Sequence, residues 1–420
     1  MTDRALVEAA LAQAHRAEWA YVVAATLRTV RDLDLAEECV QEAYTAALQS
    51  WRREGIPASP AAWLTTTARR RGIDAVRRDQ TLKAKLPLLV EPHLTSPEGE
   101  ADMEPRLQDE TTVPDERLRL VFLCCHPALA VEAQVALTLR LVCGVDTVDI
   151  ARAFLVPATT MAARITRAKK KITGSRIPFR LPSAAELPDR LDGVLGVVHL
   201  LFTTGYTAPT GSSVVRADLV DAALRLAETL RELLPDEPEV AGLLALLLAA
   251  DARRAARTDE HGQLIQLRDQ DPTRWDHLAL RRAHQLVMAA LPHPRAGRHT
   301  LQAAIACQHA VARDGRTTDW AQILGLYDAL LQVWPSPVVA LNRAVALAEI
   351  AGPAAALAEV RTLDQEGRLA GYHYLHAVEA DLLHRLDRPA EARDAYQRAR
   401  SLTDNAAEQR FLERQIAALE

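Results

Sequence analysis

The stretch TVDIARAFLVPATTMAARITRAKKKI, residues 147–172, does most to decide the fold of this chain. Apolar residues recur at helical spacing in its first half and again in its second half, with a tight connection at Val156 between them. These apolar positions are Ile150, Ala151 and Phe154, followed by Met161, Ile165 and Ala168. Two short helices joined in this way predict a helix-turn-helix, in which the second helix is the recognition helix.

The charge around this motif has one sign. From Ile150 to Arg180 there are eight Lys and Arg residues and no acidic residue. Arg side chains can bridge guanine edges and Lys side chains neutralise phosphates, so the pattern favours DNA binding. A solvated basic face at the end of a domain is the alternative. The residues predicted to contact DNA from the recognition helix are Thr159, Thr160, Arg164, Arg167, Lys169 and Lys170.

Composition supports an all-α protein of several domains. The 420 residues are 49% hydrophobic and only 4% aromatic, and helix formers abound. The net charge of −5 conceals an asymmetry, because residues 1–180 carry +2 and the remainder carries −7. An acidic chain of this kind can still bind nucleic acid through a local basic patch.

Several classes of function are not indicated. The five cysteines form no CxxC pair and read as reduced, intracellular thiols, and the adjacent Cys124 and Cys125 read as buried packing residues. No signal peptide or membrane span is expected, so we predict a cytoplasmic protein. No phosphate loop, nucleophile elbow or zinc-protease motif occurs, so we expect no catalytic residue, no metal site and no cofactor.

A second basic helix is predicted near the N-terminus. In WLTTTARRRGIDAVRRD, residues 63–79, five arginines lie within ten residues, and Asp74 lies four residues from both Arg70 and Arg78. Alone, this pattern is typical of a salt-bridged surface helix. The preceding helix, AEECVQEAYTAALQSW at 36–51, has a buried stripe and an opposite polar face. An acidic, proline-containing linker is predicted at 86–114, between this region and the helix-turn-helix.

The C-terminal part shows weak internal repetition. Tyr327, Val360 and Tyr396 recur at spacings of 33 and 36 residues, and small residues allow close helix contact around Tyr396. This resembles a tetratricopeptide helix-turn-helix array, whose period is about 34 residues. A generic stack of helical hairpins is the alternative.

These motifs together resemble an extracytoplasmic-function (ECF) sigma factor of bacterial RNA polymerase. The helix at 36–51 resembles the part of sigma region two that grips the polymerase clamp, and 63–79 resembles the helix that reads the minus-ten element. Residues 115–172 resemble region four, which binds the polymerase flap and reads the minus-thirty-five element. The segments DERLRLVFLCCHPAL and HLLFTTGYTAP resemble a subgroup with a helical, tetratricopeptide-like extension.

The resemblance implies roles for individual residues. Arg70 stands where the family usually has Asn, and Leu155 and Pro157 replace the usual turn Gly and capping Ser. The polymerase-binding residues implied are Glu38, Gln41 and Glu42. The minus-ten residues implied or predicted are Arg69, Arg70, Asp74, Arg77 and Arg78. The implied partners are core RNA polymerase and promoter DNA, with a protein partner or an intramolecular contact for the repeats and no membrane.

We therefore expect two small helical sigma domains followed by an α-solenoid-like extension. The predicted divisions are 1–85 for region two, 86–114 for the linker, 115–175 for region four, 183–285 for a helical middle domain and 286–420 for the repeats. The expected function is promoter-specific initiation, with the extension modulating activity. A stand-alone regulator with a protein-binding repeat domain and a scaffold protein are the competing hypotheses.

Overall fold

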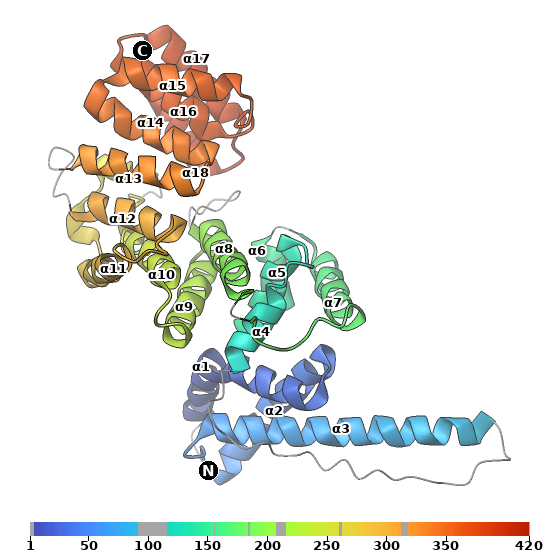
Figure 1. The fold of residues 1–420 in the computed structure, drawn as a ribbon. Helices are drawn as coiled ribbons and strands as arrows, with labels where there is room; N and C mark the ends of the chain where they lie inside the picture. Colours follow the sequence, from blue (N-terminus) through green and yellow to red (C-terminus); the bar gives the residue numbers. More distant parts are fainter. Residues whose placement is uncertain are drawn as a thin grey trace. The chain divides into compact units, whose positions relative to one another are not determined.

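The described part of the chain is all α-helical, as the sequence predicts. The computed structural model describes residues 4–90, 116–154, 156–183, 185–206, 216–259, 263–311 and 318–419. Most of the predicted linker at 86–114 lies outside these ranges, as does Leu155. The chain divides into two compact units, Met1–Val197 and Val198–Glu420, and the division falls within α8 (Leu187–Tyr206) (Figure 1).

Three long helices begin the first unit: α1 (Arg4–Val30), α2 (Leu33–Glu54) and α3 (Pro60–Val90). Each of them packs against the other two. The Asp32 side chain caps α2 by accepting a hydrogen bond from the Leu35 N–H at 2.8 Å. Gly72 lets α3 approach α1 closely, because a Cβ at this position would lie 2.4 Å from Val30 Cγ1.

Shorter helices complete the first unit and include the predicted helix-turn-helix. They are α4 (Glu116–Cys124), α5 (Val131–Leu137), a π-helical turn (Thr138–Val142), α6 (Thr147–Ala153) and α7 (Ala158–Gly174). The helices α6 and α7 pack against each other. Met161, Ile165 and Ala168 are at most 5% exposed on α7, so the predicted inward face of the second helix is confirmed.

The adjacent cysteines are packing residues, as predicted. Cys124 and Cys125 are buried, and Cys125 Sγ lies 3.5 Å from Thr138 Oγ1. Burial raises the pKa of both thiols, that of Cys125 to about 11. Throughout the described ranges, no three His, Cys, Asp or Glu side chains come together as a group that could hold a metal ion.

The second unit is a succession of antiparallel helical hairpins. Its α-helices are α9 (Ala217–Leu233), α10 (Pro238–Asp251), α11 (His277–Ala290), α12 (Arg298–Val311), α13 (Trp320–Val333), α14 (Pro337–Ala351), α15 (Pro353–Gln365), α16 (His373–Arg385), α17 (Pro389–Ser401) and α18 (Ala406–Ala417). Three single turns of 3₁₀-helix lie between α10 and α11, at Arg254–Ala256, Leu267–Asp269 and Pro272–Arg274.

The apolar α10 is buried by its neighbours, as its composition predicts. It packs against α9, α11 and α12. Glu239 at its N-terminal end caps α12, because its carboxylate accepts hydrogen bonds from the N–H groups of Gly297, His299 and Thr300 at 2.8–3.1 Å. Burial alone would raise the pKa of Glu239, but the donors of His299 and Thr300 outweigh burial and lower it to about 2.

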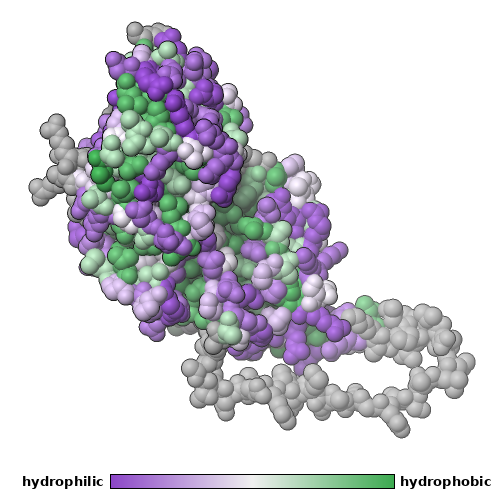
Figure 2. Space-filling model, turned by 45° about the horizontal axis from the view of Figure 1, so that its top comes forward, coloured by the Kyte–Doolittle hydropathy of each residue, from purple (hydrophilic) through white to green (hydrophobic). Residues whose placement is uncertain are grey.

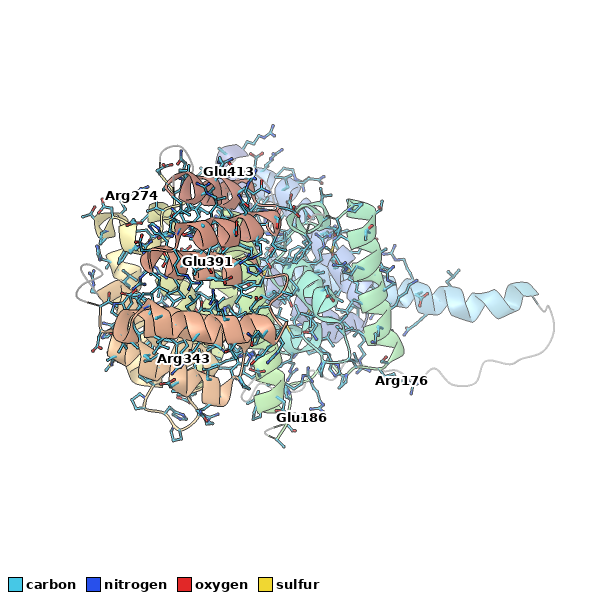
Figure 3. All side chains as sticks on the ribbon, turned by 90° about the horizontal axis from the view of Figure 1, so that it is seen from above. Arg176, Glu186, Arg274, Arg343, Glu391 and Glu413 are labelled. Carbon is cyan, nitrogen blue, oxygen red and sulfur yellow. The ribbon has the colours of Figure 1, made fainter. Side chains whose placement is uncertain are left out.

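Each of the helices from α13 to α17 packs against the next one in sequence. Within this array α14, α15 and α17 each begin with proline in the first turn, where its missing N–H costs nothing. Tyr327, Val360 and Tyr396 lie on α13, α15 and α17, at matching places in successive hairpins. Arg343 on α14, marked in Figure 3, pairs with Asp328 of α13 at 2.6 Å and with Glu359 of α15 at 2.9 Å.

The face of the molecule drawn in Figure 2 is mixed in polarity. Green, hydrophobic residues stand between purple, hydrophilic ones on the face drawn in Figure 2. Among the described residues, no helix is both long and apolar enough to cross a membrane.

Candidate nucleic-acid interface

The outer face of α7 presents most of the predicted DNA-binding residues. Thr159, Thr160, Arg167 and Lys170 are exposed, and Arg164 is half-buried. Thr159, Thr160, Arg167 and Lys170 point away from the buried stripe of Met161 and Ile165. Arg164 lies at the edge of that stripe, because positions three and four apart share one side of a helix.

The start of α7 is held by its backbone. Pro157 precedes α7 without a side-chain cap, and its carbonyl accepts the Thr160 N–H at 2.9 Å. Pro157 therefore occupies the position where the family usually has a capping Ser, and it supplies no side-chain cap. The predicted departure at Leu155 lies outside the described residues.

Lys169, which the sequence also predicts to contact DNA, is placed differently from the exposed residues of α7. Its side chain is buried, with 8% exposed, and points away from the outer face of α7. The ammonium Nζ donates to Glu37 Oε2 at 2.6 Å and to Asp34 Oδ1 at 2.7 Å, and both acids lie on α2. In this arrangement Lys169 joins the two halves of the first unit and is not available to a phosphate.

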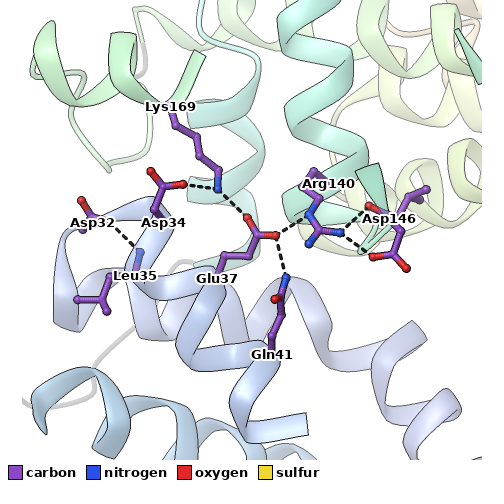
Figure 4. Close-up of polar contacts among 9 residues, drawn as sticks. Asp32, Asp34, Leu35, Glu37, Gln41, Arg140, Asp146 and Lys169 are labelled. Carbon is purple, nitrogen blue, oxygen red and sulfur yellow. Dashed lines mark hydrogen bonds and ion pairs between the residues drawn. The ribbon is translucent and has the colours of Figure 1, made fainter. Parts of the chain in front are cut away.

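Glu37 is the centre of the contact between α2 and the helix-turn-helix domain (Figure 4). Its Oε2 accepts from Lys169, while its Oε1 accepts from Arg140 Nε at 2.5 Å and from Gln41 Nε2 at 3.1 Å. Arg140 lies on the π-helical turn and also donates to Asp146 Oδ1 at 2.9 Å. One carboxylate therefore bridges two cations that come from the other half of the unit.

These charges are largely removed from water. The exposed side-chain fractions are 9% for Glu37, 8% for Lys169 and 13% for Arg140. Burial alone would lower the pKa of Lys169, but hydrogen bonds to Asp34 and Glu37 outweigh burial and raise it. Removing one partner of such a buried ion pair strongly destabilises the protein, because the remaining charge stays buried without compensation.

The sequence carried a signal for this cluster that was missed. Glu37 lies on the buried stripe of α2 with Leu33, Ala36 and Val40. Lys169 lies on the buried stripe of α7 beside Ala168. A single charge on a buried apolar stripe needs a partner of opposite charge. Glu37 and Lys169 are two such charges of opposite sign, so the sequence could have predicted that they pair.

A second set of contacts reinforces the same arrangement. Arg28 of α1 donates to Glu116 of α4 at 3.0 Å, and the Glu116 side chain is only 4% exposed. Gly144 adopts a positive φ of 68°, and a Cβ there would lie 2.6 Å from His15 Cε1 on α1. The turn before α6 therefore packs directly on α1, and only glycine fits it.

The basic face of α3 is mainly open to solvent. Arg70, Asp74, Arg77 and Arg78 are exposed. Arg69 is half-buried, and its Nε donates to Thr29 Oγ1 at 3.2 Å. Arg78 Nε donates to the Asp74 carbonyl at 3.3 Å.

The predicted polymerase-binding residues line the exposed side of α2. Glu38, Gln41 and Glu42 are all exposed. Gln41 donates to Glu37, and Glu42 accepts from Arg71 Nη1 of α3 at 2.5 Å. This face therefore adjoins both the Glu37 cluster and the basic helix α3.

Three family models match parts of the chain. Residues 15–81 match the model of sigma-70 region 2, residues 119–172 match sigma-70 region 4, and residues 190–291 match a family of unknown function, DUF6596. An uncharacterised protein of Rhizobium meliloti (strain 1021) is 43% identical over 416 residues, which cover 99% of this chain and 96% of that protein. No solved structure is significantly similar to the chain.

Proposed function

The chain belongs to the sigma-70 family of RNA polymerase sigma factors, as an ECF-like member with a C-terminal extension, and on this premise we propose that it binds core RNA polymerase and directs initiation at specific promoters. One observation carries the proposal. Two helices with exposed arginines, α3 and α7, lie on two different sigma regions of one chain. A stand-alone helix-turn-helix regulator needs only the second of them.

Each face has a role in this proposal. Glu38, Gln41 and Glu42 on α2 dock on the polymerase, and the exposed arginines of α3 contact the minus-ten element. Thr159, Thr160, Arg164, Arg167 and Lys170 on α7 contact the minus-thirty-five element. The polymerase, in the cytoplasm, performs the phosphoryl transfer, and the chain itself is no enzyme.

The compact first unit is the free state in our proposal, and it opens on the polymerase. The two promoter elements are centred roughly 25 base pairs apart, which is roughly 85 Å of duplex at ~3.4 Å per base pair. In the structure, by contrast, Lys169 Nζ of α7 lies 2.6 Å from Glu37 Oε2 of α2, so region two and region four adjoin. The 25 residues between Val90 and Glu116 span up to about 85 Å when extended, which suffices for separation.

The C-terminal extension modulates activity in this proposal, and its tetratricopeptide character remains part of the proposal. The division into domains at 1–85, 115–175, 183–285 and 286–420 is likewise proposed. The alternative function is a stand-alone regulator whose repeats bind a protein partner.

Co-elution with core polymerase tests the proposal. The full chain and purified core enzyme, mixed and separated by gel filtration, are expected to elute as one complex. Glu42→Lys is expected to weaken the complex, whereas the matched charge change Glu54→Lys at the end of the same helix, where Glu54 is 64% exposed, leaves it intact. Binding of the chain to its promoter alone, with no complex, would favour the stand-alone regulator.

A further inference from the structure

The C-terminal helices and the connection between α10 and α11 line a partly open cavity of about 990 Å³ within the second unit. Its wall comes mainly from α14, α16 and α18 (the inner helices), with Trp320 and Tyr327 from α13 and Tyr396 from α17. Cavities that hold small organic ligands have volumes of about 300–1,000 Å³. This cavity therefore has the size of a small-molecule site.

The chain itself closes one side of the cavity. Residues 263–276, the last part of the connection between α10 and α11, supply Leu264, Ile265 and Trp275 to the wall. This segment is tied down by Arg414 of α18, which donates to the Gln263 side chain and to the Leu264 carbonyl, and by Arg268, which donates to Asp381 of α16 at 3.3 Å. Because this segment is bound to α16 and α18, a long peptide laid along the inner helices would have to displace it, whereas a compact ligand would not.

Six aromatic rings line the cavity among aliphatic side chains. They are Trp275, Trp320, Tyr327, Tyr374, Tyr396 and Phe411, and they come from five different elements. Aromatic side chains stack on flat, apolar molecules and supply large contact areas to them. The wall is thus suited to a ligand that is itself aromatic.

The charged groups of the wall already have partners. Arg268 pairs with Asp381 at 3.3 Å, Arg385 with Glu349 at 2.7 Å, and His373 with Glu408 at 3.1 Å. The carboxylate of Glu408 also accepts from the Tyr374 hydroxyl at 2.7 Å. A charged ligand would break one of these pairs or remain uncompensated, so the wall favours a ligand without net charge.

A histidine at the cavity carries no charge at neutral pH. Burial, aided by the nearby Arg253 guanidinium, lowers the pKa of His309 to about 4. Its ring also lies 5.4 Å from that of Trp320, in an edge-to-face arrangement.

We propose that this cavity is a binding site for an uncharged aromatic small molecule. The site lies wholly in the extension, so it gives that part of the chain a ligand of its own. The proposal stands apart from the sigma-factor assignment, because it rests on the walls of the cavity alone.

Binding of N-phenyl-1-naphthylamine, an uncharged dye that fluoresces in apolar surroundings, tests the proposal on the full chain. We expect saturable binding of one dye per chain. The anionic dye 8-anilinonaphthalene-1-sulfonate is expected to bind at least tenfold more weakly. Equal affinity for the two dyes, or binding that does not saturate, would overturn the proposal.

Two substitutions on one helix locate the site. Val345→Trp fills the cavity, since Val345 lines it and is 37% exposed, and should weaken dye binding at least tenfold. Ile350→Trp is the matched control, because Ile350 is 48% exposed on the same helix outside the cavity wall, and should leave binding unchanged. If Val345→Trp loses helicity, Asn342→Trp, another exposed position of the wall, takes its place.

The alternative occupants have distinct outcomes. Unchanged affinity in both folded cavity-filling variants would place the dye elsewhere and refute the site. Displacement of the dye by a member of a peptide library, or by self-association at high chain concentration, would assign the cavity to a macromolecule and would equally refute a small-molecule site.

Discussion

Replacing Glu37 by Gln is expected to open the first unit. The substitution keeps the size of the side chain and removes the charge that Arg140 and Lys169 share. The two cations would then face each other with less compensation in a region that excludes water. Because the bridge joins α2 to the helix-turn-helix domain, the loss should fall on the contact between the two halves, while each half keeps its own core.

The structure sets the size of the effect. Removing one partner of a buried ion pair costs about 3–5 kcal/mol. Asp34 and Asp146 remain as partners, but they are 66% and 79% exposed, so they compensate only in part. We therefore expect the lower value, about 3 kcal/mol, which changes the ratio of closed to open chains by roughly a hundredfold.

Energy transfer between two dyes measures the opening. Gln49 on α2 and Thr173 on α7, both exposed, are replaced by cysteine for labelling, and the half-buried Cys143 is replaced by Ala. We expect high transfer in the parent chain, low transfer in Glu37→Gln, and tighter binding of the variant to core polymerase, because no closed population competes. Glu54→Gln, a change at an exposed acid of the same helix, is the control.

The reasoning would be refuted by one combination of results. If Glu37→Gln keeps its helicity, its energy transfer and its polymerase affinity unchanged, the ionic bridge does not hold the unit closed.

Four further predictions concern the polymerase-binding face, the recognition helix, the cap of α12 and the extension. Glu42→Lys should lower affinity for core polymerase at least tenfold while changing stability by only about 0–1 kcal/mol, since its Arg71 partner is 40% exposed; titration of the labelled chain against polymerase checks this, and equal affinity would remove Glu42 from the interface. If Arg167 reads a base, Arg167→Ala should weaken binding to the preferred promoter by about 1–3 kcal/mol. An equal loss of affinity on all DNA sequences, with a weaker dependence of affinity on salt concentration, would instead assign Arg167 to a phosphate contact. Because folding lowers the pKa of Glu239 to about 2, its ionised carboxylate stabilises the fold by about 3 kcal/mol above its unfolded pKa, and this stabilisation is lost as pH falls from about 4.5 to 2. In Glu239→Gln, the stability of the second unit should therefore depend less on pH in this window. An unaltered profile of stability against pH would contradict the capping role. A chain ending at Val197 should stay folded and lose promoter-dependent transcription, while increased transcription would identify the extension as an inhibitor.

Periodicity and charge were enough to predict the helix-turn-helix. The inward positions of α7 follow from helical spacing, and of its predicted DNA contacts Thr159, Thr160, Arg167 and Lys170 are exposed, whereas Arg164 is half-buried and Lys169 is buried. The all-helical fold and the sigma-like order of regions were also predictable, because each region has its own local pattern. Prolines begin α3 and several later helices, but α3 continues to Val90, five residues into the segment 86–114 that was predicted to be a linker.

The role of Lys169 was not predictable from its own neighbourhood. Lys169 is the first of three consecutive lysines, 169–171, on a basic helix, a pattern that is typical of phosphate contacts. Its actual partner, Glu37, lies 132 residues away on another helix. Pairings at such separation depend on how two domains meet, and helical spacing fixes only which side of its own helix a residue occupies. The cavity of the extension was unpredictable for the same reason, because its wall combines segments from residue 264 to residue 412.

Transcription with purified components tests the central claim most directly. Promoters are first found by transcript profiling after overexpression, as upstream sequences shared by the induced transcripts. The full chain and core polymerase are then incubated with one such promoter and nucleotides. We predict transcripts that begin at a fixed distance from two conserved elements, only when both proteins are present, and that vanish in the Arg164→Ala, Arg167→Ala double variant. Tight binding of the chain to the promoter without any such transcript would contradict the account.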